Sequence, residues 1–383
     1  MSADEAKTPP VSDLRICFIS DVATPHVNAI LGELCRRPGV DLDLWYSAES
    51  SSAYPTWKAN PTHAIKRANL LGSRTPSRRL LQKVLSQREC RPVVVGWSNP
   101  TTRVLLPLLD AARRRFVFFT DEPYEGGRRG LLRTAARTAY MGVIRRRATV
   151  LATGVNAVEY FVRRGVPRGR VVDAPIPTMV PRDLPRLRAR RLETRRRYDI
   201  PEDAVMAIAG SRLVHLKGFD VLVRAVADLE PADRRRLRVL LVGAGPEESA
   251  LRELIARYAV ADAVSLRPWM EMSDLEAAFA AADVAIHPSR FDGYGATSLM
   301  AMGIGLPIVG TRTAGAAAEL VVPGVNGYLY DAEDVSALRD HLRALLRRPE
   351  LAAAMGRESA RLADRWSPQR VADIFMDALQ RLE

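Results

Sequence analysis

The chain has 383 residues, of which 47% are hydrophobic and 26% charged, and it carries a formal net charge of +13 at pH 7. This length exceeds the roughly 250–300 residues at which a single hydrophobic core stops growing, so we expect two domains. No apolar run is long enough to predict a transmembrane helix, and three cysteines (Cys17, Cys35 and Cys90) are too few for a disulfide framework. The first residues lack the basic start and apolar core of a signal peptide, so we expect a cytoplasmic protein.

Apolar runs rich in Val, Ile, Leu and Phe alternate with helix-like segments along the first half. Strands are predicted at 15–20, 42–46, 93–96, 116–120 and 150–153, and helices at 27–37 and 102–115. Continuous apolar strands flanked by helices are typical of a parallel sheet covered on both faces.

The second half repeats this alternation after a proline-rich linker at 175–185. Strands are predicted at 205–209, 237–242, 264–266, 284–287, 308–310 and 327–330, and helices at 221–229, 246–258, 274–281, 335–347, 350–364 and 368–382. Two doubly wound domains of this kind place their ligands at the carboxyl ends of the strands.

Positive charge is concentrated in the first half of the chain. Residues 1–185 contain 29 Lys and Arg against 16 Asp and Glu, whereas residues 186–383 contain 28 of each. Such charge favours an anionic membrane surface or an anionic acceptor, or it is simply a solvated basic face. We expect no nucleic-acid partner, because no helix-turn-helix, zinc or aromatic stacking motif accompanies the charge.

The segment 288–311 carries the most informative pattern. An apolar strand leads into a loop, Asp292–Gly295, that contains one carboxylate and two glycines, and an apolar helix follows from Ala296. Glycines before a helix let backbone N–H groups approach an anion, and the helix dipole favours negative charge there. The Asp292 carboxylate would repel phosphate, so it is better suited to accept hydrogen bonds from hydroxyls. Phosphate and hydroxyls together predict a nucleotide sugar.

This segment resembles the donor-site signature of family 4 retaining glycosyltransferases with the GT-B fold, P-S-x-x-E-G-F-G-x-x-x-x-E-A-M-A-x-G-x-P. The matching residues are Pro288, Ser289, Gly293, Gly295, Ala301, Met302, Gly305 and Pro307. Asp292 stands at the first Glu, Tyr294 at the Phe, and Met300 at the second Glu. In the family the first Glu contacts the donor sugar and the second holds the ribose. The resemblance therefore implies a sugar contact through Asp292, Gly293, Tyr294 and Gly295, and a missing ribose contact.

A second segment, 208–226, resembles the family's G-R-L-x-x-x-K-G. The resemblance implies that Arg212 and Lys217 meet the donor diphosphate together with Gly295, Ala296 and Thr297. Fixed cations there would stabilise the charge that develops on the departing diphosphate. The alternative for Arg212 and Lys217 is a solvated loop.

Nearly the whole chain takes part in the resemblance, which implies an α/β fold of two Rossmann-like domains facing a cleft. Residues 1–180 would form the acceptor-binding domain, 181–365 the nucleotide-sugar-binding domain, and 366–383 a helix that crosses back. A retaining, metal-independent reaction without a cofactor is also implied, in line with the lack of an Asp-x-Asp motif in the cleft segments.

The acceptor side carries weaker signals. Thr24 and His26 begin a predicted helix at the cleft rim, where His26 could bond a phosphate or hydroxyl or cap the helix. Asp121 and Glu122 follow a buried strand and are predicted to face the cleft near the donor sugar, the alternative being a turn that caps the next helix. The candidate catalytic residues are thus Asp121, Glu122, Arg212, Lys217 and Asp292.

The nucleoside is expected beside Trp269, Met270 and Met300, with core packing as the alternative for Trp269. Met300 leaves three explanations open: another residue holds the ribose, the donor binds weakly, or the donor lacks a hydroxyl. No metal ligands are predicted, because no histidine has partners at metal-ligand spacing.

These observations predict a retaining hexosyltransferase. Its donor would be a UDP-sugar first, or a dTDP- or GDP-sugar second, and its acceptor a hydroxyl of a cell-envelope glycan, a lipid or a small natural product. The basic half would allow peripheral contact with the inner membrane face. One alternative, suggested by Met300, is a catalytically weakened nucleotide-sugar-binding relative with a regulatory role, and another is a GT-B enzyme with different chemistry, such as a phosphorylase or an epimerase.

Overall fold

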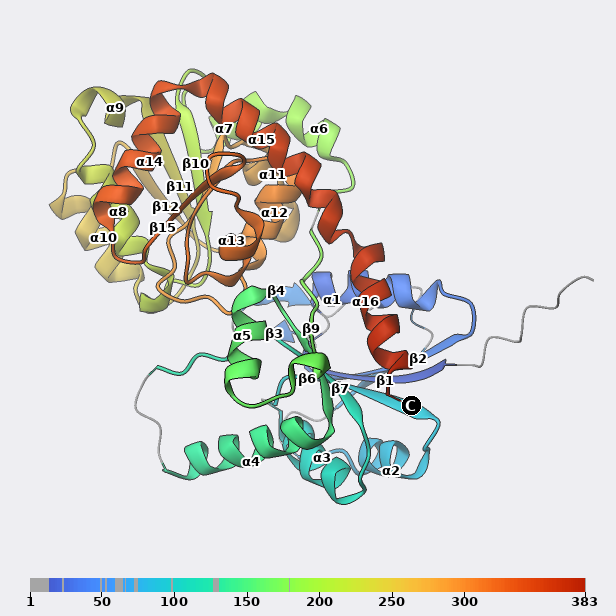
Figure 1. The fold of residues 1–383 in the computed structure, drawn as a ribbon. Helices are drawn as coiled ribbons and strands as arrows, with labels where there is room; N and C mark the ends of the chain where they lie inside the picture. The colour runs from blue at the N-terminus through green and yellow to red at the C-terminus, as the bar shows by residue number, and fades with distance from the viewer. Residues whose placement is uncertain are drawn as a thin grey trace, which may run out of the picture.

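The described residues form two parallel α/β units joined by an irregular segment (Figure 1). The computed structural model describes residues 14–22, 24–48, 50–51, 54–58, 65, 67–71, 75–97, 99–126, 131–178 and 180–382. Within them, no helix is long and apolar enough to cross a membrane.

The first unit is a seven-stranded parallel sheet in the order β5-β2-β1-β6-β7-β8-β9. Its strands are β1 (Leu14–Val22), β2 (Val40–Ala48), β5 (Arg67–Leu70), β6 (Cys90–Val95), β7 (Phe116–Thr120), β8 (Ala148–Ala152) and β9 (Val171–Asp173). The helices around it are α1 (Pro25–Cys35), α2 (Arg78–Ser86), α3 (Pro100–Ala111), α4 (Leu131–Arg147) and α5 (Val155–Arg163), with a short 3-10 turn η1 (Arg168–Arg170). A separate antiparallel pair joins β3 (Ser50–Ser51) to β4 (Tyr54–Lys58).

The second unit is a six-stranded parallel sheet in the order β12-β11-β10-β13-β14-β15. Its strands are β10 (Val205–Gly210), β11 (Leu237–Val242), β12 (Val264–Arg267), β13 (Val284–His287), β14 (Ile308–Thr311) and β15 (Gly327–Tyr330). Its helices are α6 (Leu184–Ala189), α7 (Arg191–Arg197), α8 (Phe219–Ala227), α9 (Pro231–Arg236), α10 (Glu248–Arg257), α11 (Met272–Ala281), α12 (Ala296–Ile304), α13 (Gly315–Leu320), α14 (Val335–Arg347) and α15 (Pro349–Ala363). Two short 3-10 turns are η2 (His215–Lys217) and η3 (Asp364–Trp366), and the chain continues into α16 (Pro368–Gln380).

Strand β7 shows why these apolar runs form buried parallel strands. Val117 and Phe118 are both fully buried but belong to different hydrophobic clusters. Phe118 packs with residues of α3 and α4, whereas Val117 packs with residues of α1 and α16. Because successive side chains of a strand point to opposite faces, a strand covered on both sides must be apolar throughout.

The C-terminal helix α16 packs on the first sheet beside α1, far from the domain that precedes it in the chain (Figure 1). Phe375 is fully buried, with its ring centroid 4.9 Å from that of Phe119 and 6.3 Å from that of Phe18. Burial of one such side chain contributes about 1.5–3 kcal/mol. The last helix is therefore part of the core of the first domain.

The linker differs slightly from the prediction at its C-terminal end. The described residues of the linker are irregular up to Asp183, but α6 begins at Leu184 and contains Pro185 in its first turn. The first turn tolerates proline because its N–H groups have no partner within the helix. The predicted linker of 175–185 therefore extends two residues too far at its C-terminal end.

Strand order determines which loops meet. β10 and β13 are neighbours although about 75 residues separate the loops that follow them, and they run parallel, so both loops leave the same edge of the sheet. β1, β6 and β7 are likewise neighbours in the first sheet. These two edges carry the candidate site.

Candidate active site

Asp292 lies at the centre of a polar cluster at the ends of β10 and β13. Its Oδ2 accepts a hydrogen bond from Lys217 Nζ at 2.5 Å and lies 3.0 Å from His287 Nε2. The Asp292 side chain is 16% exposed, and those of Lys217 and His287 are almost fully buried. Burial alone would raise the pKa of Asp292, but the Lys217 charge and the His287 hydrogen bond outweigh it and hold that pKa well below its usual range. Asp292 is therefore ionised at neutral pH.

His287 links this carboxylate to α12. Its Nδ1 lies 2.5 Å from the Ser298 hydroxyl, while its Nε2 faces Asp292. A neutral ring with its proton on Nε2 satisfies both contacts, since the Ser298 hydroxyl can then donate to Nδ1. His287 thus orients the Asp292 carboxylate, a role that the sequence did not reveal.

Two glycines allow the close packing around Asp292. Gly295 has φ of +106°, and a Cβ there would collide with the His287 ring. A Cβ at Gly293 would collide with the Asp121 carboxylate, which comes from the first domain. Bare backbone at both positions therefore brings the acidic loop against His287 on one side and Asp121 on the other.

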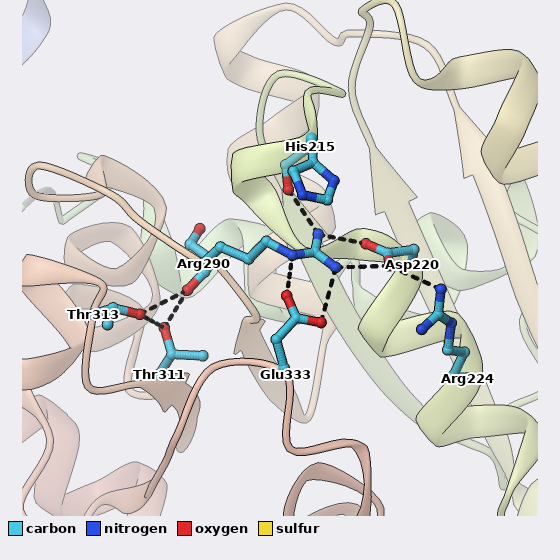
Figure 2. Close-up of polar contacts among 8 residues, drawn as sticks. His215, Asp220, Arg224, Arg290, Thr311, Thr313 and Glu333 are labelled. Atoms are coloured by element: carbon cyan, nitrogen blue, oxygen red, sulfur yellow. Dashed lines mark hydrogen bonds and ion pairs between the residues drawn. The ribbon is translucent and has the colours of Figure 1, made fainter. Parts of the chain in front are cut away.

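Arg290 contacts His215, Asp220 and Glu333 (Figure 2). It thereby joins the loop before Asp292 to the turn η2, which contains Lys217. Its guanidinium donates two hydrogen bonds to Asp220, at 2.7 and 2.8 Å, and one to the carbonyl oxygen of His215 at 2.7 Å. It also pairs with Glu333 through Nε and Nη2. The backbone N–H of Arg290 donates to Leu216 at 2.9 Å. The Arg290 side chain is 13% exposed, so these charge-assisted contacts are largely buried.

We expect Arg290→Met to lower the stability of the protein by about 2–4 kcal/mol, because it leaves the Asp220 and Glu333 carboxylates without their main partner. Activity should fall as well, because the turn that contains Lys217 loses the hydrogen bond between Arg290 and the carbonyl oxygen of His215. Arg252→Met is the matched control, because Arg252 forms an exposed i,i+4 pair with Glu248 that contributes little. Thermal unfolding of both variants measures the difference, and equal melting temperatures would contradict a stabilising role of the Arg290 contacts.

The N-terminus of α12 faces a cavity of about 190 Å³ between the two domains. Residues from both sides line it, among them Thr24, His26, Asp121, Ser211, Trp269, Asp292, Tyr294, Gly295, Ala296, Thr297 and Met300. The unpaired N–H groups of a helix start favour an anion at this position. Ligand pockets usually hold about 300–1,000 Å³, so a complete nucleotide sugar would have to extend beyond this cavity or part the two domains.

The cavity wall near the expected nucleoside is apolar. Met300, which is 3% exposed, lies there with Met272, Leu275 and Ile176. Trp269 also lines the cavity. No carboxylate stands at the position of Met300, so a ribose hydroxyl beside it would lack a charged acceptor.

Asp121 opens onto the cavity opposite Asp292. Desolvation beside the cavity, together with repulsion from Asp292, raises the pKa of Asp121 to about 6, although the residue keeps an exposed surface at the cleft. His26 bonds Thr24 through Nε2 at 2.9 Å, and burial lowers its pKa to about 4, so its ring is neutral. The first domain thus contributes one titrating carboxylate and one neutral imidazole.

We expect kcat/KM to fall as the pH drops below about 6, because Asp121 becomes protonated there. Asp121→Asn should remove this acidic limb of the pH profile. Because its folded pKa exceeds the unfolded value of about 4, wild type loses stability relative to the variant as pH rises from about 4 to 6. Asp121→Asn should therefore be the more stable protein at neutral pH. Glu319→Gln is the control, since burial and repulsion from Asp173 raise the pKa of Glu319 to about 7 away from the cavity. Loss of the limb in that variant instead would assign it to Glu319.

Several predicted site residues lie elsewhere. Glu122 does not line the cavity; its charged neighbours are Arg163, Glu125 and Glu159. It points away because successive residues leaving a strand face opposite sides. Arg212 is exposed and lies outside the cavity lining, and the buried Lys217 is connected to the cavity through Asp292, which lines it. Met270 is partly buried against the hydrophobic core, with its sulfur 3.4 Å from the Tyr198 hydroxyl.

Glu319 marks a junction between the domains that the sequence did not reveal. Its Oε1 accepts a hydrogen bond from Trp366 Nε1 at 2.6 Å, and its Oε2 lies so close to Gly154 that a Cβ there would come within 2.6 Å. Gly154 belongs to the first domain and Trp366 to the turn before α16. A carboxylate at this junction connects α13 to both.

Among the residues that the structure describes, no group of three or more His, Cys, Asp or Glu side chains is arranged to hold a metal ion. The expectation of a reaction without metal or cofactor stays a prediction.

The two facing sheets define the class of fold, which is GT-B. The structure superimposes on Alr3699/HepE of Anabaena, solved in complex with UDP, with a TM-score of 0.74 at 18% identity, covering 96% of this chain and 100% of that one. It also matches WaaG, a glycosyltransferase involved in lipopolysaccharide biosynthesis, with a TM-score of 0.67 at 17% identity over 94% of this chain and 99% of that one. At such identities these likenesses establish the fold alone.

Residues 190–362 match the family model described as glycosyl transferases group 1. D-inositol 3-phosphate glycosyltransferase of Streptomyces avermitilis is 34% identical over 203 residues, which cover 50% of this chain and 43% of that protein. The enzyme of the same name from Saccharomonospora viridis is 34% identical over 205 residues, 51% of this chain and 47% of its own. The chain thus spans less than half the length of these curated relatives. The match to the glycosyl transferases group 1 model lies within the second domain of this GT-B fold.

Proposed function

We propose that this protein is a retaining glycosyltransferase that moves a hexose-type sugar from a nucleotide diphosphate sugar to a hydroxyl group. The observation that supports this proposal is the ionised Asp292, which Lys217 and His287 hold beside the N-terminus of α12 in the cavity between the domains. That arrangement supplies an acceptor for sugar hydroxyls next to an anion-binding helix end.

Some of these residues would bind the diphosphate and others would orient the sugar. The backbone at Gly295–Thr297 and the Lys217 ammonium would hold the diphosphate, whose negative charge grows as the sugar departs. Lys217 has three N–H donors, and the one bonded to Asp292 leaves others for phosphate oxygens. Asp292 would orient the sugar from one side and Asp121 from the other.

We propose same-face transfer as the route to retention. The bond from the anomeric carbon to the phosphate oxygen breaks as the bond to the acceptor oxygen forms, and the acceptor proton passes to the departing diphosphate. No protein nucleophile is needed, and neither a metal nor a cofactor is assigned. Asp121 and His26 would position the acceptor hydroxyl at the cavity edge.

A UDP-sugar is the first choice of donor, supported by the UDP bound to the structural neighbour HepE, and a dTDP- or GDP-sugar is the second. The acceptor would be a cell-envelope glycan, a lipid or a small molecule, and the names of the curated relatives add inositol phosphate to the compounds to be tested. A cytoplasmic location with contact at the inner membrane face completes the proposal.

The test is the release of nucleoside diphosphate from a panel of UDP-, dTDP- and GDP-hexoses, with and without candidate acceptors. We expect one donor to be consumed, NMR of the product to show the anomeric configuration of the donor, and a chelator to leave the rate unchanged. An inverted product would contradict the retaining mechanism.

The second candidate is a nucleotide-sugar-binding relative with weakened catalysis. Met300 at the apolar nucleoside wall and the small cavity favour it. Calorimetry separates the two: binding of a nucleotide sugar without turnover or hydrolysis would support the weakened relative, and measurable turnover would exclude it.

A further inference from the structure

A second pocket opens in the first domain between α3, α4 and the described residues Trp97, Pro123 and Tyr124, which follow β6 and β7. We call it the α3–α4 pocket; it has a volume of about 580 Å³ and is lined by Trp97, Arg103, Tyr124, Arg133, Arg137 and Tyr140 among others.

The positive charge of this pocket is largely unbalanced. Arg103 and Arg133 are exposed, and neither forms an ion pair with a described carboxylate, although Arg103 Nε donates to the Trp97 carbonyl oxygen at 3.3 Å. By contrast, Arg146 and Arg147 on the same helix α4 share Asp110. None of the described residues that line the pocket is acidic. Free guanidinium groups facing a common space favour an anion there.

Aromatic rings form the wall beside these arginines. The Trp97 ring stacks on Phe118 with centroids 5.5 Å apart and on Tyr140 at 6.4 Å. Arg137 lies 5.9 Å from the Trp97 centroid and donates to the carbonyl oxygen of Tyr124 at 3.2 Å. The wall is therefore fixed by packing, and its volume falls in the range of small-molecule sites.

The pocket lies close to the candidate active site along the chain. Tyr124 lines the pocket and Asp121 lines the cavity, and three residues span at most about 10 Å. The Tyr124 ring also contacts Phe291, with centroids 5.1 Å apart, next to Asp292. A ligand of sugar size held here could place a hydroxyl at Asp121.

We propose that the α3–α4 pocket binds a phosphate monoester on the acceptor, so that the acceptor is a phosphorylated sugar or polyol. The inference rests on the proposed glycosyl transfer and names the chemistry of its second substrate. Arg103 and Arg133 hold the phosphate, Trp97 packs on the ring that carries it, and Arg137 keeps the 123–125 loop in place.

Calorimetry on the UDP-saturated protein tests this, because UDP occupies the donor phosphate site. The probes are inorganic phosphate and glucose 6-phosphate, with glucose as the neutral comparison. We expect both phosphates to bind at millimolar concentration, glucose to bind far more weakly, and Arg103→Ala and Arg133→Ala each to weaken phosphate binding about tenfold. Arg115→Ala is the matched control, because Arg115 is exposed and precedes β7 at the opposite end of that strand.

Phosphate binding that Arg115→Ala weakens as much as Arg133→Ala would overturn the proposal, and so would no binding of either phosphate. Binding confined to phosphatidylglycerol vesicles would also overturn it and would assign the charge to a membrane surface. UDP binding and UDP-sugar hydrolysis are measured on the same samples. If they persist while phosphate fails to bind, only this inference falls; if they are absent, the proposed function falls.

Discussion

We expect Lys217→Ala to lower kcat about a hundredfold with its nucleotide-sugar donor. Lost stabilisation of a departing group is typically worth about 2–4 kcal/mol, and each 1.36 kcal/mol is a factor of ten. The Lys217 side chain is 7% exposed and lies 2.5 Å from Asp292. At such a buried position, water cannot readily take over the stabilisation that the ammonium group provides.

A second effect accompanies this loss. The Lys217 charge lowers the pKa of Asp292, whereas burial and repulsion from Asp121 raise it. Removing Lys217 should therefore raise the pKa of Asp292. The Lys217 charge also lowers the pKa of Asp121, so the acidic limb of the kcat/KM profile that we assign to Asp121 should move to higher pH in Lys217→Ala, which a purely structural defect would not produce.

Lys83→Ala is the matched control, because Lys83 also pairs with a buried aspartate, Asp43, but in the first domain. It should lower stability and leave kcat nearly unchanged. Near-normal turnover in Lys217→Ala would refute the assignment of this loop to the diphosphate.

Arg212→Ala should lower turnover about tenfold or more, although Arg212 is exposed and outside the cavity lining. Its position just after β10 places it near the Lys217 loop, and it would meet the diphosphate when the donor extends beyond the cavity. Steady-state kinetics of the variant tests this, and unchanged kcat would remove Arg212 from the site.

The strands were predictable where apolar runs are continuous. β7, β11, β13 and β15 begin and end where the sequence predicts. α4, α6 and α7 were not predicted, because arginines interrupt their apolar pattern and α6 follows a proline-rich segment. These helices form through packing in the folded chain, which outweighs weak local signals.

The site was predictable residue by residue but not as a cluster. Motif order pointed to Lys217 and Asp292 separately, whereas their ion pair arises only because β10 and β13 are neighbours in the sheet. The contact of His287 with Asp292 is local instead, because Asp292 lies in the loop that directly follows the strand ending at His287. The direction of Glu122 was missed because adjacent residues after a strand diverge.

Met300→Glu should raise kcat/KM for a UDP-sugar relative to a dTDP-sugar by about ten- to a hundredfold. A hydrogen bond to a charged group is worth about 1.5–3 kcal/mol, and a thioether supplies none of that strength. The ribose of a UDP-sugar has a 2′-hydroxyl to bond the new carboxylate, whereas deoxyribose has none. The apolar wall of Met300, Met272 and Leu275 suits the bare carbon.

The measurement is a donor panel on wild type, Met300→Glu and Met300→Gln, the last as a neutral control of similar size. Burial should raise the pKa of a carboxyl at this position, so the panel is run at mildly alkaline pH. A wild type that prefers dTDP-sugars and a Glu variant that turns toward UDP-sugars would identify a deoxyribose donor. A wild type that strongly prefers UDP-sugars, with the ratio unchanged in Met300→Glu, would show that another group holds the ribose, because the carboxylate then adds nothing that the site lacks.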